Sequence, residues 1–232
     1  MGGLDKFKAY ENVFDQSTLR SLFKLSSQNY FDELKSLISL GKEANVFSAT
    51  KDDGYVAVKI YRVSANFKKM YEYMSPDPRF AGLKRNKTSI IYSWAKKEYR
   101  NLLKCRKVGI KVPKPIAVYK NILVMEFIGK NNDPAPLMSQ CPPEDPKIFY
   151  ERLIKDVQML YREARLVHGD LSAFNVINYE ERPIIIDWSH AVDLRYPNVK
   201  ELLKRDIKNV CMRFKKQGFI LDPEKEFERV IK

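Results

Sequence analysis

The stretch Val167–Ala191, VHGDLSAFNVINYEERPIIIDWSHA, decides the fold around it. Its apolar segments frame three polar residues, Asp170, Asn175 and Asp187. Glu180–Pro183 separates two short apolar runs and predicts a turn, so we expect a loop, then a β-hairpin, then an acidic residue. A hairpin folds the chain back on itself, which would bring Asp187 beside the loop that carries the other two polar residues.

Two carboxylates and an amide that converge at one point can support phosphoryl transfer. Asp170 would orient the attacking hydroxyl group, while Asn175 and Asp187 would hold Mg²⁺ against the phosphates of a nucleotide. The same spacing of polar residues occurs in protein kinases. An ordinary loop and hairpin with surface acids is the alternative. Against it, Asp187 directly follows Ile184–Ile186, and an acid that ends a buried strand is costly unless it is paired or liganded.

The composition is that of a globular protein with an excess of positive charge. The chain has 232 residues, of which 44% are hydrophobic and 31% charged, and a formal net charge of +13. This length suffices for one large domain or for two lobes. Lys and Arg occur along the whole chain, which favours nucleic acid or another polyanion as a partner. A charge that serves only solubility is the alternative.

Zinc and membrane proteins are disfavoured. The cysteines Cys105, Cys141 and Cys211 lie far apart without a CxxC motif, so no zinc site is expected. No apolar run reaches the roughly 20 residues of a membrane span, and the N-terminus lacks the apolar segment of a signal peptide. Lys6 stands where a myristoylation signal after Gly2 has Ser or Thr. We therefore expect a cytoplasmic protein without a membrane partner.

The chain up to residue 91 predicts a helical extension, a turn and a basic loop. Residues 4–36 are expected to be helical, so that residues 1–36 pack as an extension on the rest of the chain. The segment Ile38–Phe47 predicts a turn that covers a nucleotide, although it lacks the GxGxxG pattern and a plain hairpin turn is the alternative. Residues 62–91 are basic and interrupted by prolines, which predicts a mobile loop. This loop carries Ser64, Ser75, Thr88 and Ser89.

A lysine and a glutamate are expected to pair. Tyr55–Tyr61 predicts a strand with Lys59 in its middle, where the side chain either snorkels from an edge strand or reaches nucleotide phosphates. Residues 93–107 predict a helix with Glu98 on its apolar face, so Glu98 needs a partner. Lys59 is the expected partner, as in kinases, and a half-exposed glutamate at the rim is the alternative.

The second half of the chain is expected to be mostly helical. Asn121–Ile128 predicts an apolar strand, followed by a linker over residues 130–146. Helices are expected over residues 148–164 and 194–214, with a short final helix after them. Few residues follow Asp187, which leaves no room for the helices that dock peptide substrates in ordinary protein kinases.

Six segments together resemble the RIO family of atypical protein kinases: ISLGKEANVF, VAVKIYRVS, WAKKEYRNL, LVMEFIG, LVHGDLSAFN and IIIDWSHAV. The short, archaeal-like form of subfamily one is most similar. The resemblance implies an α+β, bilobal, protein-kinase-like fold, with an N-lobe at residues 37–128 and a truncated C-lobe at residues 129–232. It also implies serine phosphorylation with ATP and Mg²⁺ (or Mn²⁺), autophosphorylation in the basic loop, and ATPase activity. Its expected partner is the precursor of the small ribosomal subunit with its rRNA.

The resemblance assigns roles to the polar residues. It implies that Lys59 contacts phosphate with Glu98 as its partner, and that Asp170 is the catalytic acceptor. Asn175 and Asp187 become ligands of Mg²⁺, and Asp187 is also expected to take phosphate as an aspartyl intermediate.

The remaining nucleotide contacts are implied in the same way. Met125 occupies the gatekeeper position, and the carbonyl of Glu126 and the amide of Ile128 contact adenine. Lys42, in the turn after the first predicted strand, is expected to contact the nucleotide.

Two other functions stay open. Gly169 and Trp188 replace the alanine and the smaller residue that the family usually has, and the resulting HGD and IDW are common in aminoglycoside and choline phosphotransferases. A small-molecule phosphotransferase is therefore one alternative. The other is an rRNA-binding assembly factor that uses ATP only as a switch. The sequence does not identify a protein substrate.

Overall fold

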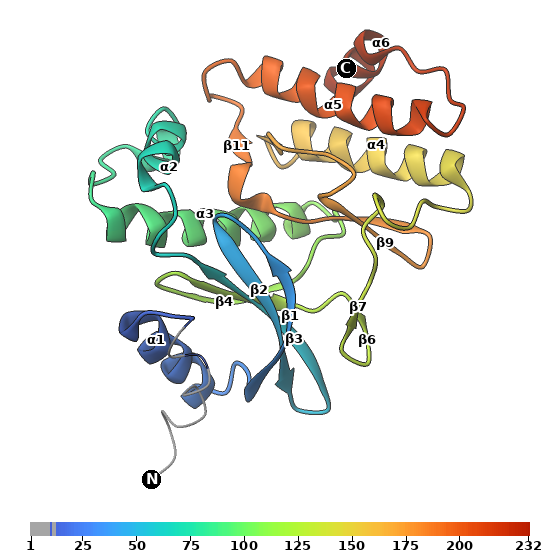
Figure 1. The fold of residues 1–232 in the computed structure, drawn as a ribbon. Coiled ribbons are helices and arrows are strands. Elements are labelled where there is room, and N and C mark those ends of the chain that lie inside the picture. Colours follow the sequence, from blue (N-terminus) through green and yellow to red (C-terminus); the bar gives the residue numbers. More distant parts are fainter. Residues whose placement is uncertain (1–9, 11–12) are drawn as a thin grey trace. The chain divides into compact units, whose positions relative to one another are not determined.

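A computed structural model describes residue 10 and residues 13–232 (Figure 1). The chain forms two compact units. The first holds the chain up to Tyr73, Gly82–Tyr99 and Lys114–Pro134; the second holds Met74–Ala81, Arg100–Pro113 and Ala135–Lys232. Both units are thus discontinuous in sequence, whereas the lobes expected from the sequence are continuous ranges.

The first unit is built on a five-stranded antiparallel sheet. Its order is β1-β2-β3-β5-β4. The strands are β1 (Glu33–Leu40), β2 (Ala44–Lys51), β3 (Gly54–Tyr61), β4 (Pro115–Tyr119) and β5 (Ile122–Glu126). The strands predicted from Tyr55 and from Asn121 are confirmed as β3 and β5. Because β3 pairs with β2 on one side and β5 on the other, it is an inner strand.

One face of the sheet is covered by α1 (Gln16–Ser27), whose buried leucines join a core with Val58 and Val124. Asp15 caps the helix by accepting hydrogen bonds from the amides of Ser17 and Thr18, both at 3.0 Å.

The prediction of helix over residues 4–36 is confirmed only for α1. The chain leaves the helix after Gln28, since Asn29 has φ +62°, and residues 33–36 belong to β1. Buried Phe31 and Leu34 attach this segment to the core instead. Residues 1–9, 11 and 12 lie outside the described residues, so the prediction for them stays a prediction.

The basic segment 62–91 is more ordered than the predicted mobile loop. It contains α2 (Phe67–Met74) and the 3-10 helix η2 (Pro78–Phe80), and α3 (Lys87–Lys107) begins inside it. Met70 and Met74 on α2 are buried, which fixes this short helix despite the flanking prolines. The helix predicted for residues 93–107 therefore begins earlier than expected.

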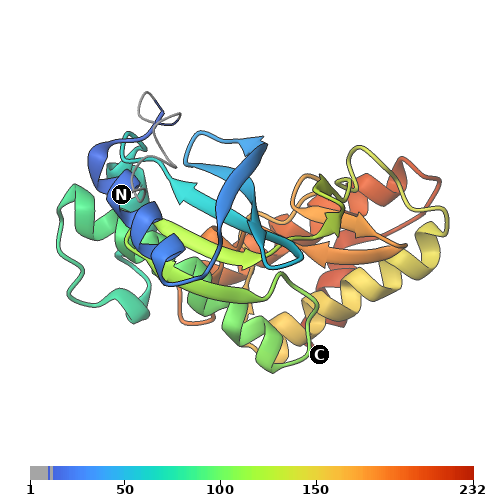
Figure 2. The same ribbon diagram turned by 90° about the horizontal axis from the view of Figure 1, so that it is seen from below.

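The second unit is mainly helical. Its helices include α4 (Pro146–Arg162), α5 (Val199–Lys215) and α6 (Pro223–Ile231). They confirm the predicted helices, except that residues 194–198, expected at the start of the second one, form turns. A hairpin of β9 (Val176–Tyr179) and β10 (Arg182–Ile185) lies against α4 in both ribbon views (Figures 1 and 2). A short ladder joins β8 (Leu166–Val167) to β11 (Val192–Asp193), and the 3-10 helix η3 (Trp188–His190) precedes β11. The small strands β6 (Gly129–Lys130) and β7 (Asp133–Pro134), at the start of the expected linker, belong to the first unit.

The predicted hairpin after the polar loop is confirmed. Glu180 and Glu181 both have positive φ, 51° and 57°, as in the type I′ turns that match the twist of paired strands. Over the part of the chain that the structure describes, no helix is both long and apolar enough to cross a membrane.

Candidate active site

Lys59 and Glu98 form a buried ion pair in the first unit. Nζ of Lys59 lies 2.9 Å from a carboxylate oxygen of Glu98, and the two residues are 7% and 1% exposed. The hydroxyl of Tyr61 donates a further hydrogen bond to the same carboxylate. The predicted pair is thus confirmed, and the alternative of a half-exposed glutamate is wrong.

The position of β3 explains why this lysine is buried. Lys59 lies opposite Val46 on β2 and Leu123 on β5, so its backbone is paired on both sides. A lysine there does not snorkel from an edge strand. Its charge is stable only because Glu98, on the apolar face of α3, is held within reach.

The segment expected to contact adenine continues from β5. Glu126 and Lys114 are linked in both directions: the amide of Glu126 donates to the carbonyl of Lys114 at 2.8 Å, and the Glu126 carboxylate accepts from the Lys114 amide at 2.9 Å. Met125 and Ile128 are half-buried. Their contacts with a nucleotide, like that of Lys42, stay predictions.

Lys42 lies in a tight hairpin turn between β1 and β2. The amide of Gly41 donates to the carbonyl of Ala44 at 2.9 Å, and a Cβ at Gly41 would lie only 2.7 Å from that carbonyl oxygen. The turn therefore requires glycine at this position, which leaves Lys42 exposed at its tip.

In the second unit, the predicted convergence of polar residues is confirmed. Nδ2 of Asn175 donates to the backbone carbonyl of Asp170 at 2.7 Å and to its carboxylate at 3.1 Å. The amide of Ile186 donates to the carbonyl of Asn175 at 3.0 Å, so Asp187 comes directly beside the loop. Asp187 has φ +60°, and its carboxylate accepts a hydrogen bond from Ser189 Oγ at 2.8 Å.

Asp206, to which the sequence patterns assign no role, holds the loop. Its carboxylate, 1% exposed, accepts hydrogen bonds from the amides of Gly169 (2.7 Å) and Leu171 (2.9 Å). Burial raises the pKa of Asp206 to about 7, although both amides and Arg205 act in the opposite direction. Gly169 has φ +79°, a conformation that strains any residue with a Cβ, so glycine suits this position better than alanine.

His168 and Trp188 bind the main chain at Asp170 and just before Asp187. Nε2 of His168 donates to the carbonyl of Ile186 (3.0 Å), and its Nδ1 accepts from the amide of Asp170 (3.3 Å), which requires a neutral imidazole. Burial agrees with this, since it lowers the pKa of His168 to about 4. The ring of Trp188 packs edge-on against that of His168, with 4.9 Å between the ring centroids. Nε1 of Trp188 donates to the carbonyl of Ile185.

A second buried network, which sequence patterns do not reveal, fixes the chain after Asp187. Nδ2 of Asn101 donates to the carbonyls of Trp188 (2.8 Å) and Ala191 (3.0 Å). Arg79 donates to Asn101 Oδ1 (2.7 Å), to the Ala191 carbonyl (3.0 Å) and, through both Nε and Nη2, to Asp77. Asp77 and Asn101 are fully buried. Asn101 and Arg79 thus hold the backbone at the start of η3 and just after its end, and Asp77 holds Arg79 in place.

The donor set around Asn175 and Asp187 suits a magnesium ion. The amide nitrogen of Asn175 is used for Asp170, which leaves its oxygen to face a cation, and Asp187 supplies a carboxylate. Magnesium prefers one or two such protein oxygens and takes its other ligands from water and phosphates. The described residues contain no group of three or more His, Cys, Asp or Glu side chains that could hold a metal ion.

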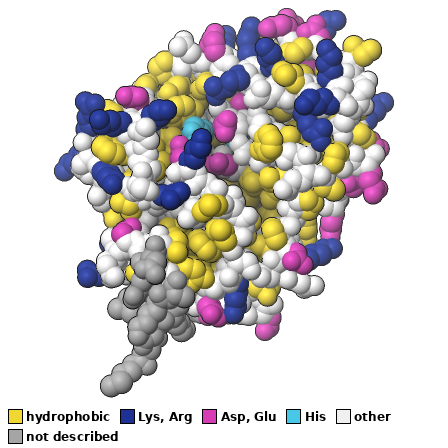
Figure 3. Space-filling model, viewed as in Figure 1, with side chains coloured by type: hydrophobic (Ala, Val, Ile, Leu, Met, Phe, Trp, Pro, Cys, Tyr) yellow, Lys and Arg dark blue, Asp and Glu magenta, His cyan; other side chains and the backbone are white. Residues whose placement is uncertain are grey.

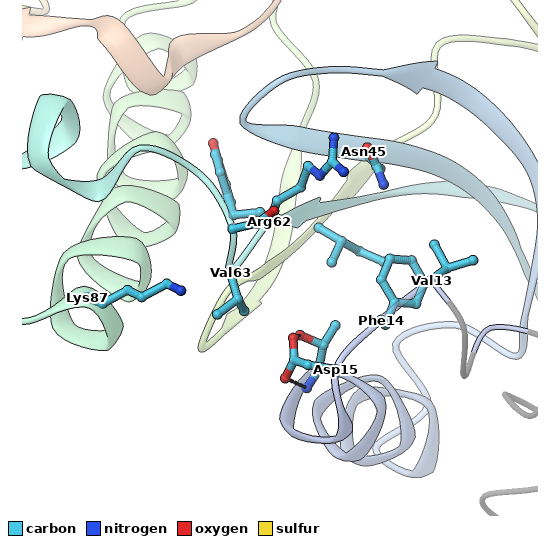
Figure 4. Close-up of a pocket in the computed structure, with 11 residues that line it drawn as sticks. Val13, Phe14, Asp15, Asn45, Arg62, Val63 and Lys87 are labelled. Carbon is cyan, nitrogen blue, oxygen red and sulfur yellow. Dashed lines mark hydrogen bonds between the residues drawn. The ribbon is translucent and has the colours of Figure 1, made fainter.

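A cavity of about 360 Å³ in the first unit is separate from these residues. It lies between the start of α1, the end of β3 and the start of α3, with Arg62 and Lys87 extending toward it (Figure 4). It includes Tyr61 but neither Lys59 nor Glu98. The cavity is therefore not the predicted nucleotide site.

Comparison with known proteins identifies the family. The RIO domain model matches residues 45–227. The RIO-type serine/threonine-protein kinase Rio1 of Haloferax volcanii is 41% identical over 97% of this chain and 78% of its own length. Rio1 of Methanocaldococcus jannaschii is 37% identical over 92% and 74%.

A solved structure shows the same fold. The Rio2 kinase of Chaetomium thermophilum, described as an ADP/Mg²⁺-phosphoaspartate complex, has a TM-score of 0.69 at 21% identity. The match covers 91% of this chain but 65% of that protein, so Rio2 is the longer of the two. The predicted kinase-like α+β fold is thereby confirmed. Together with the domain match and the archaeal relatives, it shows that this chain belongs to the RIO family of serine/threonine-protein kinases.

Proposed function

We propose that this RIO kinase uses ATP and Mg²⁺ to phosphorylate serine and acts in the cytoplasm during maturation of the small ribosomal subunit. Kinase activity follows from the family. The cellular task is our proposal, supported by the net charge of +13, which favours a large polyanionic partner.

The geometry supports a division of roles. Lys59, fixed by Glu98, offers one positive charge to the nucleotide phosphates. Asp170 accepts the proton of the attacking hydroxyl, with its carboxylate oriented by Asn175. Asn175 and Asp187 would hold Mg²⁺, which would neutralise phosphate charge. The Chaetomium Rio2 structure is described as an ADP/Mg²⁺-phosphoaspartate complex, and we propose that an Asp187 oxygen can likewise take the γ-phosphate of ATP, with ADP as the leaving group.

One observation carries the proposal: the hydrogen bond from Asn175 to the Asp170 carboxylate, with Asp187 beside the same loop. This arrangement gives the two acids different roles: Asp170 would act on the attacking hydroxyl group, and Asp187 would bind the metal ion. Asp170→Asn should therefore bind Mg·ATP almost as tightly as the wild type and fail to transfer phosphate. Calorimetric titration of Asp170→Asn and Asp187→Asn with Mg·ATP tests this. Binding lost equally in both variants would contradict the assignment.

Autophosphorylation is expected in the segment 62–91. Ser64 and Ser75 are the candidates there by exposure, whereas Ser89 is half-buried and its amide is bonded to Asn86 at the start of α3. Hydroxyls tethered to the same chain act at a high effective concentration. Mass spectrometry after incubation with Mg·ATP should find phosphate on Ser64 or Ser75, and phosphate found only outside this segment would count against the proposal.

The ribosomal partner makes a separate prediction. Lys and Arg side chains are spread widely over the visible face of the molecule (Figure 3). If about six of them contact RNA phosphates, binding to small-subunit particles should weaken roughly 10³-fold between 50 and 200 mM salt. A small-molecule kinase would ignore the particles and phosphorylate choline or an aminoglycoside. No particle binding at low salt, together with such turnover, would replace our proposal by that alternative.

A further inference from the structure

A basic groove lies on the second unit, among residues without an assigned role. It has a volume of about 280 Å³ and is formed by α4, the chain after α3, and the β9–β10 hairpin. Its lining contains four cationic side chains and one acid, with Met159 and Gly109 as apolar surface. The cationic residues are Lys111, Arg152, Lys155 and Arg182, all exposed, and the acid is Asp156.

The acids near this groove are fewer than its cations. The carboxylate of Glu181, at the hairpin turn, accepts from the amides of Glu144 and Asp145, and the Glu181 carbonyl accepts from Arg152 Nη1 at 2.8 Å. Asp156 is half-buried, and burial raises its pKa to about 7 even though Lys155 and Lys111 act to lower it. The cations therefore outnumber the acid four to one, and that acid is only partly ionised near neutral pH.

The combination of cations and a carboxyl group distinguishes between anionic partners. The carboxylates of an acidic peptide would pair with the cations, but those side chains offer no donor to the Asp156 carboxyl group. A nucleotide can satisfy both, because its phosphate binds the cations while the N–H groups of its base donate to the carboxyl group. The bases of a duplex have these edges paired. A single strand can turn a base inward, against an apolar surface such as Met159.

We propose that this groove binds single-stranded RNA, with phosphates against Lys111, Arg152, Lys155 and Arg182 and one base turned toward Asp156. The inference rests on the proposed function for its partner, ribosomal RNA, and names the surface that contacts it. The groove lies entirely within the second unit, and it includes none of the residues assigned to phosphoryl transfer.

The test uses a matched pair of charge reversals in the full chain. The groove variant carries Lys155→Glu and Arg182→Glu. The control carries Lys208→Glu and Lys215→Glu, two exposed lysines on α5 outside the groove, so both variants change the net charge equally. Unchanged thermal unfolding and unchanged Mg·ATP binding establish that both variants are folded. Fluorescence anisotropy then measures affinity for a labelled single-stranded RNA dodecamer over a range of salt concentrations.

We expect the groove variant to bind the RNA at least tenfold more weakly than the control. Its salt slope should also be smaller by about 1.4, since each phosphate contact in a single strand contributes about 0.7. Equal losses in both variants would overturn the inference, because the whole positive field would then account for binding. Tighter binding of polyglutamate than of RNA by the wild type would overturn it as well.

A second variant tests the inward base. Asp156→Leu, which removes the acceptor oxygens, should lower the affinity for RNA relative to that for inorganic polyphosphate, which has no bases. An unchanged or increased ratio of the two affinities would overturn this placement of the base. Binding to small-subunit particles is measured in parallel. Should the groove variant bind particles as the wild type does, this inference fails while the proposed function stands. A wild type that binds neither particles nor RNA contradicts both.

Discussion

The lysine–glutamate pair and the loop of acids are held in opposite ways. In the first unit Lys59 and Glu98, to which we assign the nucleotide phosphates, stabilise each other. In the second unit the acids to which we assign catalysis, Asp170 and Asp187, are not the support. Asp206, His168 and Asn101 bind the main chain around them, at Gly169, Ile186 and Trp188. At the first site the same side chains therefore serve the proposed function and the stability of the fold. At the second site different side chains do so.

The difference follows from what each site has to bind. A lysine that waits for phosphate inside a sheet needs a permanent counter-ion, since a buried unpaired charge is very costly. The proposed tasks of Asp170 and Asp187 are to face a hydroxyl group and a metal ion, so neither acid is paired with a buried cation. Asp206, His168 and Asn101 position the main chain around them, while Asn175 and Ser189 donate one hydrogen bond to each carboxylate. Mutations that separate activity from stability test this contrast.

The largest effect is expected for Asp187→Asn. Loss of the carboxylate that we propose binds the metal should reduce Mg²⁺-dependent turnover by about 10³-fold or more. The free energy of unfolding should hardly change, because the backbone supports remain. Turnover assays beside chemical denaturation measure both quantities. A large loss of unfolding free energy beside the loss of activity would contradict this, because the Asp187 side chain would then itself stabilise the loop.

Lys59→Met should reduce both activity and stability. It leaves the carboxylate of Glu98 buried without the cation that balances its charge, which we expect to cost about 3–5 kcal/mol of unfolding free energy. Adding Glu98→Gln should restore much of this stability without restoring turnover. Denaturation curves of the single and double variants form the test, and a stable but inactive single variant would contradict the shared role of the pair.

Asn101→Ala removes the two hydrogen bonds to the carbonyls of Trp188 and Ala191. Leaving these buried groups less well satisfied should cost about 2–3 kcal/mol, and the looser chain after Asp187 should raise the Mg²⁺ concentration needed for half-maximal turnover. Asn209→Ala is the matched control, since Asn209 donates to the Leu171 carbonyl on the other side of the loop. If both variants raised the required Mg²⁺ concentration equally, Asn101 would have no specific effect on Asp187.

The smallest effect concerns pH and sharpens the same contrast. An unfolded imidazole takes up a proton near pH 6.5, whereas burial lowers the pKa of His168 to about 4 in the folded protein. The unfolded state therefore binds more protons in that range, and the protein should lose about 2 kcal/mol of stability between pH 7 and pH 5. His168→Gln should be less stable at pH 7 but should lose less on acidification. If the free energy of unfolding changed with pH in the same way in His168→Gln and in the wild type, groups other than His168 would determine the pH dependence.

Features that have a local signature could be predicted from the sequence. The hairpin turn at Glu180–Glu181 and the strand around Lys59 follow from spacing and alternation. The pairing of Lys59 with Glu98 followed from a polar residue on an apolar helical face. The same signal was available for Asn101 and Asp206, which interrupt the buried stripes of α3 and α5, but their partners are backbone groups that no side-chain pattern indicates.

Two other predictions failed for reasons of packing. Residues 33–36 join β1 because Leu34 is needed in the core beside α1, which helical periodicity does not reveal. The segment 62–91 is folded because Met70 and Met74 are buried, although its charge and prolines predicted mobility. In both places tertiary contacts override a local preference.

The hydrogen bonds from the amides of Gly169 and Leu171 to Asp206 have an evolutionary consequence. Amide groups are present whatever side chains the loop carries, so the shape of the loop does not depend on its catalytic acid. A descendant of this gene that lost Asp170 through a single base change would still fold and would still present the same surfaces to its partners. A single mutation could thus turn this kinase into an inactive protein that still binds its partners.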